Sequence, residues 1–230
     1  DKVFLVPGGG NMFLVDAAGN QGGIEIVPTH HEQAAIIAAE YYSRISGKLG
    51  VAVVTTGPGS TNAITGIAGA WLDSIPLLVL AGQVKTSDYN IDASLRQKGP
   101  QEIDFVSMVK KITKFAKTSI SAKGCIEDLR TAIEMAQSGR PGPAVIEIPL
   151  DIQSNLSPTH SYEKNAQPKR LKSSNKEQQP ADLKRASCEL INELNSAKKP
   201  LIIVGNGVKA AKSIEALKSI VMSLHIPVCL

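Results

Sequence analysis

The sequence predicts an α/β fold: a doubly wound, mostly parallel sheet with helices on both faces, followed by the start of a second α/β domain. Short apolar runs of four or five residues alternate with longer segments whose apolar residues recur at helical spacing. The run at residues 76–80 is continuous rather than alternating, as in strands that helices cover on both sides. Strands that alternate with helices in this way form βαβ units, which build a parallel sheet.

Each predicted element has its own signal. The helix at residues 31–45 has alanines at i, i+3 and i+4 spacing, and Gly47 follows it as the expected C-cap. A later helix is expected to be capped by Ser60 or Thr61, since either hydroxyl can cap a helix. A long polar loop is expected at residues 83–101. The predicted strands are residues 3–6, 24–27, 51–54, 76–80 and 144–148, and the predicted helices are residues 11–18, 31–45, 60–72 and 126–137.

The composition changes after the fifth predicted strand. Residues 153–180 are rich in Lys, Ser, Asn, Gln and Pro and hold few apolar residues, which is typical of a linker. The linker would join a first domain, residues 1–152, to the beginning of a second, residues 181–230. The second domain is expected to open with a helix at 181–196, a strand at 201–204, a glycine turn at 205–207 and a helix at 210–224. Both ends of the chain fall in strand-like runs, so we expect a truncated piece of a longer protein.

Charge and composition exclude several classes of function. The net charge of +4 is small, and the basic excess is concentrated in residues 164–184, which argues against a nucleic-acid partner. No apolar run approaches the ~20 residues that a membrane helix needs, and the first residues do not resemble a signal peptide. The three scattered cysteines fit neither a metal spacing nor a disulfide framework, so reduced thiols in a cytoplasmic protein are expected.

Small and polar residues follow four of the predicted strands. In a parallel sheet these segments share the carboxyl edge, where open α/β folds bind ligands. Glycines there allow a flat ligand to approach the backbone. Glu32 lies among them at a helix start, although a glutamate in a first helical turn is more commonly a surface residue that the helix dipole stabilises. The four segments are residues 7–10, 29–32, 56–59 and 81–83.

Taken singly, these motifs do not identify a site. Gly8, Gly9 and Gly10 do not match the G-x-G-x-x-G dinucleotide fingerprint, and the glycines around Pro58 lack the Gly-Lys-Ser/Thr end of a phosphate loop. The adjacent histidines 30 and 31 have no third ligand at a suitable spacing. We therefore expect no metal ligands in this chain.

The order of the segments is more specific, because it resembles the acetolactate-synthase-like family of thiamine-diphosphate-dependent enzymes over nearly the whole chain. The resemblance departs from the family at Val6, where tyrosine is usual, at Pro100, where phenylalanine is common, and in the loop of residues 92–100. These differences lie on the side of the site that would face the substrate, so the resemblance does not identify the second substrate. The matching segments are residues 7–9, 31–44, 47–51, 56–62, 73–76, 81–84, 101–102, 112–114, 139–143 and 199–207.

The resemblance implies a carboligase that decarboxylates a 2-keto acid such as pyruvate and transfers the two-carbon enamine to a second keto acid or an aldehyde. It leaves open a simple thiamine-dependent decarboxylase, and a non-catalytic fragment that keeps the fold. The implied cofactors are thiamine diphosphate and Mg²⁺, whose ligands would lie in a C-terminal domain; FAD binding stays open. A homodimer or homotetramer with the site between subunits is implied, so this fragment alone is expected to be inactive.

The resemblance also assigns the site residues. Glu32 would be the catalytic carboxylate, sharing a proton with the N1′ atom of the cofactor's pyrimidine and so favouring the imino form that activates the thiazolium C2. Its apolar surroundings would include Ala34, Ala35 and the glycine turns. The other implied residues are Gly8 and Gly9 beside the reacting centre, Pro58 and Asn62 in the pyrimidine pocket, and Gln101 on the substrate side.

Simpler roles stay open for three of these residues. Pro58 could only shape a turn, Asn62 could only cap a helix, and Gln101 could only be loop surface.

Overall fold

The computed structural model describes residues 1–89, 95–155 and 180–229, and it divides into two compact units, Asp1–Arg170 and Leu171–Leu230. Most of the predicted linker and residues 92–94 of the variant loop lie outside the described residues. The domain boundaries expected from the sequence stay a prediction. No helix among the described residues is long and apolar enough to cross a membrane.

The first unit is built on one six-stranded sheet in the order β2-β1-β3-β4-β6-β5. Every strand pair in it is parallel. The predicted doubly wound α/β fold is confirmed, and the strand order reverses direction after β2, as this topology requires. The strands are β1 (Lys2–Leu5), β2 (Glu25–Pro28), β3 (Gly50–Val54), β4 (Leu77–Gln83), β5 (Phe115–Thr118) and β6 (Pro143–Pro149).

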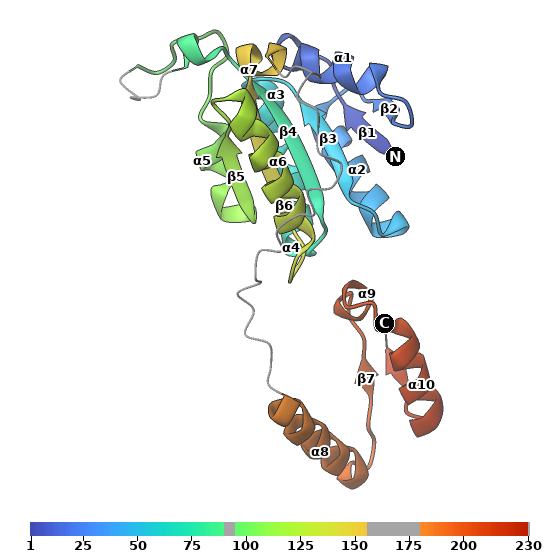
Figure 1. Ribbon diagram of the computed structural model, residues 1–230. Helices are drawn as coiled ribbons and strands as arrows, with labels where there is room; N and C mark the ends of the chain where they lie inside the picture. The colour runs from blue at the N-terminus through green and yellow to red at the C-terminus, as the bar shows by residue number, and fades with distance from the viewer. Residues whose placement is uncertain (90–94, 156–179, 230) are drawn as a thin grey trace. The chain divides into compact units, whose positions relative to one another are not determined.

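Helices cover both faces of this sheet (Figure 1). On one face, Leu77 and Val79 of β4 pack in a cluster with buried residues of α2 and α4, of which Ile36 and Ile67 are fully buried. On the other face, Leu78 packs with buried residues of α6. The helices are α1 (Met12–Asn20), α2 (Glu32–Ser46), α3 (Pro58–Asn62), α4 (Ile64–Leu72), α5 (Phe105–Val109), α6 (Ala122–Gln137) and α7 (Leu150–Ser154), with short 3-10 turns η1 (Gly9–Asn11), η2 (Thr86–Asp88) and η3 (Lys110–Ile112).

The helix after β3 does not start where the hydroxyl residues predicted. It begins at Pro58 with Gly57 as its N-cap, and it is interrupted at Ala63, so that α3 and α4 are separate. Proline suits the first helical position because its missing N–H would have no partner there. The Ser60 hydroxyl is not a cap, since it donates to the carbonyl of Thr55 over 2.6 Å.

Among the described residues, the short elements β5, α5 and α7 escaped the sequence prediction. β5 is an edge strand of four residues, its Lys117 is exposed and none of its residues is fully buried, so its apolar signal is weak. The helix expected from residue 126 begins earlier, at Ala122, because the Ser121 hydroxyl accepts a hydrogen bond from the N–H of Gly124 and caps it. The Gly47 C-cap of α2 is confirmed, with a φ of 70°.

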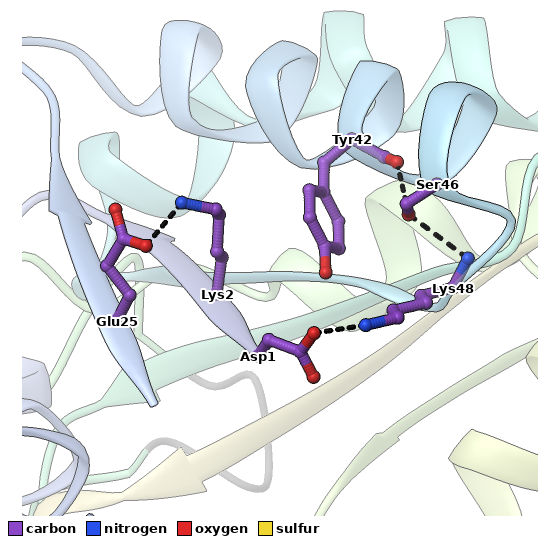
Figure 2. Close-up of polar contacts among 6 residues, drawn as sticks. All are labelled: Asp1, Lys2, Glu25, Tyr42, Ser46 and Lys48. Atoms are coloured by element: carbon purple, nitrogen blue, oxygen red, sulfur yellow. Dashed lines mark hydrogen bonds and ion pairs between the residues drawn. The ribbon is translucent and has the colours of Figure 1, made fainter. Parts of the chain in front are cut away.

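Ion pairs at the start of β1 tie this strand to its surroundings (Figure 2). Lys2 pairs with Glu25 across the β1–β2 edge, and Asp1 pairs with Lys48, which follows α2. The Ser46 hydroxyl at the end of α2 accepts a hydrogen bond from the N–H of Lys48 over 3.1 Å. Because both ion pairs are exposed, each contributes little to stability.

The described residues of the second unit form a two-stranded parallel sheet and three helices. The strand expected at residues 201–204 is present at Ile202–Ile203, and its partner is Val228–Cys229. The helix expected at residues 210–224 begins later, at Ile214, and an additional short helix precedes it at Gly207–Ala210. Lys212, with a φ of 55°, lies between the two. The elements are α8 (Pro180–Ser196), β7 (Ile202–Ile203), α9 (Gly207–Ala210), α10 (Ile214–Leu224) and β8 (Val228–Cys229).

Candidate active site

The candidate site lies at the carboxyl edge of the six-stranded sheet, where β1, β2, β3 and β4 end. His31 follows β2 and caps α2, because its Nδ1 accepts a hydrogen bond of 3.1 Å from the N–H of Gln33. This contact gives His31 a structural role that needs no metal. Glu32 is the first residue of α2, and α2 therefore aims its N-terminus and this carboxyl at the edge.

Glu32 is directed into the protein, and it is only 8% exposed. Its Oε2 accepts a hydrogen bond of 2.9 Å from Nδ2 of Asn62 in α3. Its Oε1 lies against Gly59, since a Cβ on this glycine would be 2.9 Å from that oxygen. Two segments that are 30 residues apart thus meet at one carboxyl group, and the pyrimidine-pocket role that the resemblance implies for Asn62 stays a prediction.

The expected alanine surroundings of Glu32 need a correction. Ala35 is fully buried in the core cluster beside the sheet, whereas Ala34 is exposed. Both outcomes follow from the geometry of α2, whose successive side chains point in directions about 100° apart. An apolar neighbour of the carboxyl is Gly59, which belongs to one of the glycine turns expected there.

Thr55 joins the two glycine turns. Its side chain occupies the space in which a Cβ of Gly8 would stand, and a Cβ on Gly59 would lie 2.5 Å from its Cγ2. It also accepts a hydrogen bond of 3.2 Å from the N–H of Gly10. No Cβ contact would arise at Gly9 within 4 Å, so that position opens onto free space. The sequence analysis missed Thr55, although a polar residue directly after a strand was a signal for it.

Gln101 lies beside the same turn. It is an exposed, non-glycine residue with a φ of 64°, in the left-handed region. Its carbonyl oxygen occupies the space of a Cβ on Gly57, which itself has a φ of 64°. The structure thus brings together Gln101, Gly57 and Pro58, which is exposed at the start of α3. Left-handed non-glycine residues cost about 1–3 kcal/mol and gather at functional sites.

A second carboxyl lies buried at this sheet edge, at the end of β6. Glu147 is 1% exposed, and its two oxygens accept hydrogen bonds of 2.9 Å from Nε2 of Gln83 and 2.7 Å from the Thr118 hydroxyl. Burial raises the pKa of Glu147 to about 7, and the nearby carboxylates of Glu102 and Asp104 act in the same direction. The sequence analysis missed this group, although a glutamate inside the apolar run 144–148 was a signal for it.

The chain matches known thiamine-dependent proteins. Residues 1–108 match the family model described as thiamine pyrophosphate enzyme, N-terminal TPP binding domain. The chain is 38% identical over 227 residues to the acetolactate synthase isozyme 3 large subunit of Escherichia coli (strain K12), covering 99% of this chain and 38% of that protein. It is 39% identical to the acetolactate synthase large subunit of Lactococcus lactis subsp. lactis (strain IL1403), over 98% of this chain and 37% of that protein. The chain belongs to the thiamine-pyrophosphate-dependent, acetolactate-synthase-like family.

Membership in the acetolactate-synthase-like family confirms the resemblance on which the sequence analysis depended. The similarity extends to a plant protein, the chloroplastic acetolactate synthase of Arabidopsis thaliana, at 33% identity over 90% of this chain and 29% of that protein. The chain thus spans well under half the length of the relatives that it matches. Residues 1–108 include Glu32, Asn62, the glycine turns and Gln101, so the matched family domain contains the site residues that the resemblance implied, whereas Glu147 lies outside it.

Proposed function

We propose that this chain is the pyrimidine-binding part of a thiamine-diphosphate-dependent carboligase. The enzyme would decarboxylate a 2-keto acid such as pyruvate and transfer the two-carbon unit to a second keto acid or an aldehyde. The single observation that carries the proposal is the buried carboxyl of Glu32, held by Asn62 against Gly59 in a domain of this family. The acetolactate synthase names of the relatives favour the carboligase over a simple decarboxylase.

The residues at the sheet edge fit the aminopyrimidine half of the cofactor. A ring nitrogen needs a partner that can share a proton, and Oε1 of Glu32 has no hydrogen-bond donor among the described residues. A flat ring needs close approach to the backbone, and Gly9 has open space where other residues carry a Cβ. When bound, thiamine diphosphate supplies the nucleophilic carbon and the electron sink of the reaction.

The chain's own residues then have separate tasks. Glu32 would exchange a proton with the pyrimidine N1′ atom, and Asn62 would hold Oε2 so that Oε1 faces the ring. Pro58 would line the pyrimidine pocket, and Gly8 and Gly9 would flank the reacting centre. Gln101 would contact the substrate. Residues 1–152 would form the cofactor-binding domain, and residues 181–230 would begin a second α/β domain.

The remaining parts of the proposal concern the whole enzyme. Mg²⁺ would be bound by residues outside this chain, together with the diphosphate of the cofactor. FAD would be a candidate ligand of the second domain. The enzyme would be a cytoplasmic homodimer or homotetramer with its active site between subunits. Each of these statements rests on the family, and purification of the full-length protein with cofactor analysis and sedimentation would test them.

The experiment that tests the function is proton exchange at the cofactor. In the full-length enzyme, Glu32→Gln should lower the rate of hydrogen–deuterium exchange at C2 of bound thiamine diphosphate at least ~100-fold, because general acid–base assistance is lost. An unchanged exchange rate would remove Glu32 from the mechanism. Product analysis with pyruvate separates the two reactions, since a carboligase forms a new carbon–carbon bond and a decarboxylase releases acetaldehyde.

A further inference from the structure

The buried carboxyl of Glu147 is connected to the candidate site through a continuous set of contacts. Gln83, at the end of β4, is fully buried, and its Nε2 donates both to Oε1 of Glu147 over 2.9 Å and to the carbonyl of Ile103 over 3.0 Å. Its Oε1 accepts from the N–H of Val84 over 2.8 Å. The amide of Gln83 is therefore fully used, and its orientation depends on Glu147 as an acceptor.

Ile103 is two residues from Gln101, so this hydrogen bond fastens the segment that carries Gln101. Upstream, the N–H groups of Lys98 and Gly99 donate to Oε2 of Glu102 over 2.6 and 3.1 Å. These contacts hold residues 98–103 as one unit, whose attachment to the sheet includes Gln83. The unit then places the carbonyl of Gln101 against Gly57, in the turn that leads to the Glu32 contacts.

We propose that Glu147 is a positioning residue for Gln101: its carboxyl oxygen orients the amide of Gln83, and Gln83 holds residues 98–103 against the Gly57 turn. This inference rests on the proposed function, because it takes Gln101 as the residue that contacts substrate. The left-handed backbone of Gln101 supports it, since a conformation of this kind persists only where its surroundings enforce it.

The surroundings of Glu147 favour the neutral form. Burial raises the pKa of Glu147, and the carboxylates of Asp104 and Glu102 act in the same direction, whereas the hydrogen bonds from Thr118 and Gln83 lower it. Tyr89 also faces this carboxyl, and burial followed by the charge of Glu147 raises the pKa of that phenol. Glutamine at position 147 would keep the acceptor for Gln83, because its carbonyl oxygen can accept from Nε2 of Gln83, while its amide would donate to the Thr118 hydroxyl, which can rotate to accept.

The test uses the full-length holoenzyme and a double-mutant cycle. Glu147→Leu should raise KM for pyruvate at least ~10-fold with a smaller change in kcat, and Gln101→Ala should add little further, because both changes remove one interaction. Glu147→Gln should restore KM to within about threefold of wild type. Additive effects of the two substitutions, or a Glu147→Gln variant as impaired as Glu147→Leu, would overturn the proposal.

A second readout does not depend on catalysis. Amide hydrogen exchange of residues 98–103 should speed up in Glu147→Leu at least ~10-fold and stay near wild type in Glu147→Gln. Asp128→Leu is the matched control, since Asp128 is a buried carboxyl on α6 that bonds Lys117 and Ser119 instead. Equal exchange rates of residues 98–103 in the Glu147→Leu and Asp128→Leu variants would contradict the proposal that Glu147 holds this segment in place. C2 exchange that is unaffected by Glu32→Gln would instead refute the proposed function and leave this readout interpretable.

Discussion

Oε1 of Glu32 lies beside Gly59, which has no side chain that would push the carboxyl away. A Cβ at this position would lie 2.9 Å from that oxygen and 2.5 Å from Cγ2 of Thr55. The oxygen is an end atom of a flexible side chain, whereas Thr55 is wedged between Gly8 and Gly59. A side chain at position 59 would therefore displace Glu32 first, and the position of the carboxyl depends on a residue that contributes no polar atom to it.

Substitution of Gly59 should lower both the stability of the domain and the rate of C2 exchange. We expect Gly59→Ala to cost about 1–3 kcal/mol of the free energy of unfolding, because the added methyl group overpacks the turn. It should also lower C2 exchange by displacing Glu32. Urea unfolding and cofactor exchange would measure the two effects. Gly9→Ala is the control for stability, since no atom lies within 4 Å of its added Cβ; a large loss of stability there would contradict this packing.

Asn62 holds the buried carboxyl of Glu32 by a single hydrogen bond of 2.9 Å. Asn62→Ala should destabilise the domain by about 1–3 kcal/mol, because a buried acceptor loses its donor. Asn62→Asp should be worse, since it places a second carboxylate beside the first. Thermal unfolding of both variants would check the order, and an Asp variant as stable as wild type would show that Asn62 does not face Glu32.

Glu147 should make stability depend on pH. Its pKa rises from 4.5 in the unfolded chain to about 7 in the folded protein, so the folded state binds more protons between these values. The stability that the neutral acid provides is complete below about pH 4.5 and is lost as the pH rises to about 7. Glu147→Gln removes this titration, and its advantage over wild type should grow across that window to on the order of 3 kcal/mol.

Urea unfolding of both proteins at pH 5, 6, 7 and 8 would follow that difference. Because the carboxyl titrates over this window, the two stability curves should diverge with pH and then run parallel above about pH 8. Curves that run parallel throughout would mean that Glu147 is already ionised in the folded protein at low pH.

Arg44 bridges two carboxylates of unequal burial. It contacts Glu40, whose side chain is 6% exposed, and Asp73, whose side chain is 53% exposed. The hydrogen bond to Asp73 is the largest cause that raises the pKa of Arg44. Arg44→Met should cost about 3–5 kcal/mol, because a buried carboxylate loses its partner, whereas Asp73→Asn should cost less than about 1 kcal/mol. Calorimetric unfolding would compare them, and equal losses would contradict the burial of Glu40.

The sequence by itself determined the strands and helices whose signal is local. Short, mainly apolar runs marked five of the six strands, and periodic alanines together with Gly47 marked α2. The order of short motifs also pointed to Glu32 and Asn62. β5 escaped because an edge strand with the exposed Lys117 needs no continuous apolar run. The boundary of α3 was wrong because Pro58 and Gly57 outweighed the hydroxyl residues as start signals.

Only the tertiary structure decided which side chains meet. Gln83 and Glu147 are 64 residues apart and become neighbours because β4 pairs with β6, an adjacency that the periodicity of either strand does not contain. The place of Thr55 between two glycines, and of Gln101 against Gly57, likewise depends on how separate turns come together at one sheet edge. Local patterns report which face of an element is buried, whereas sheet order and register decide what that face touches.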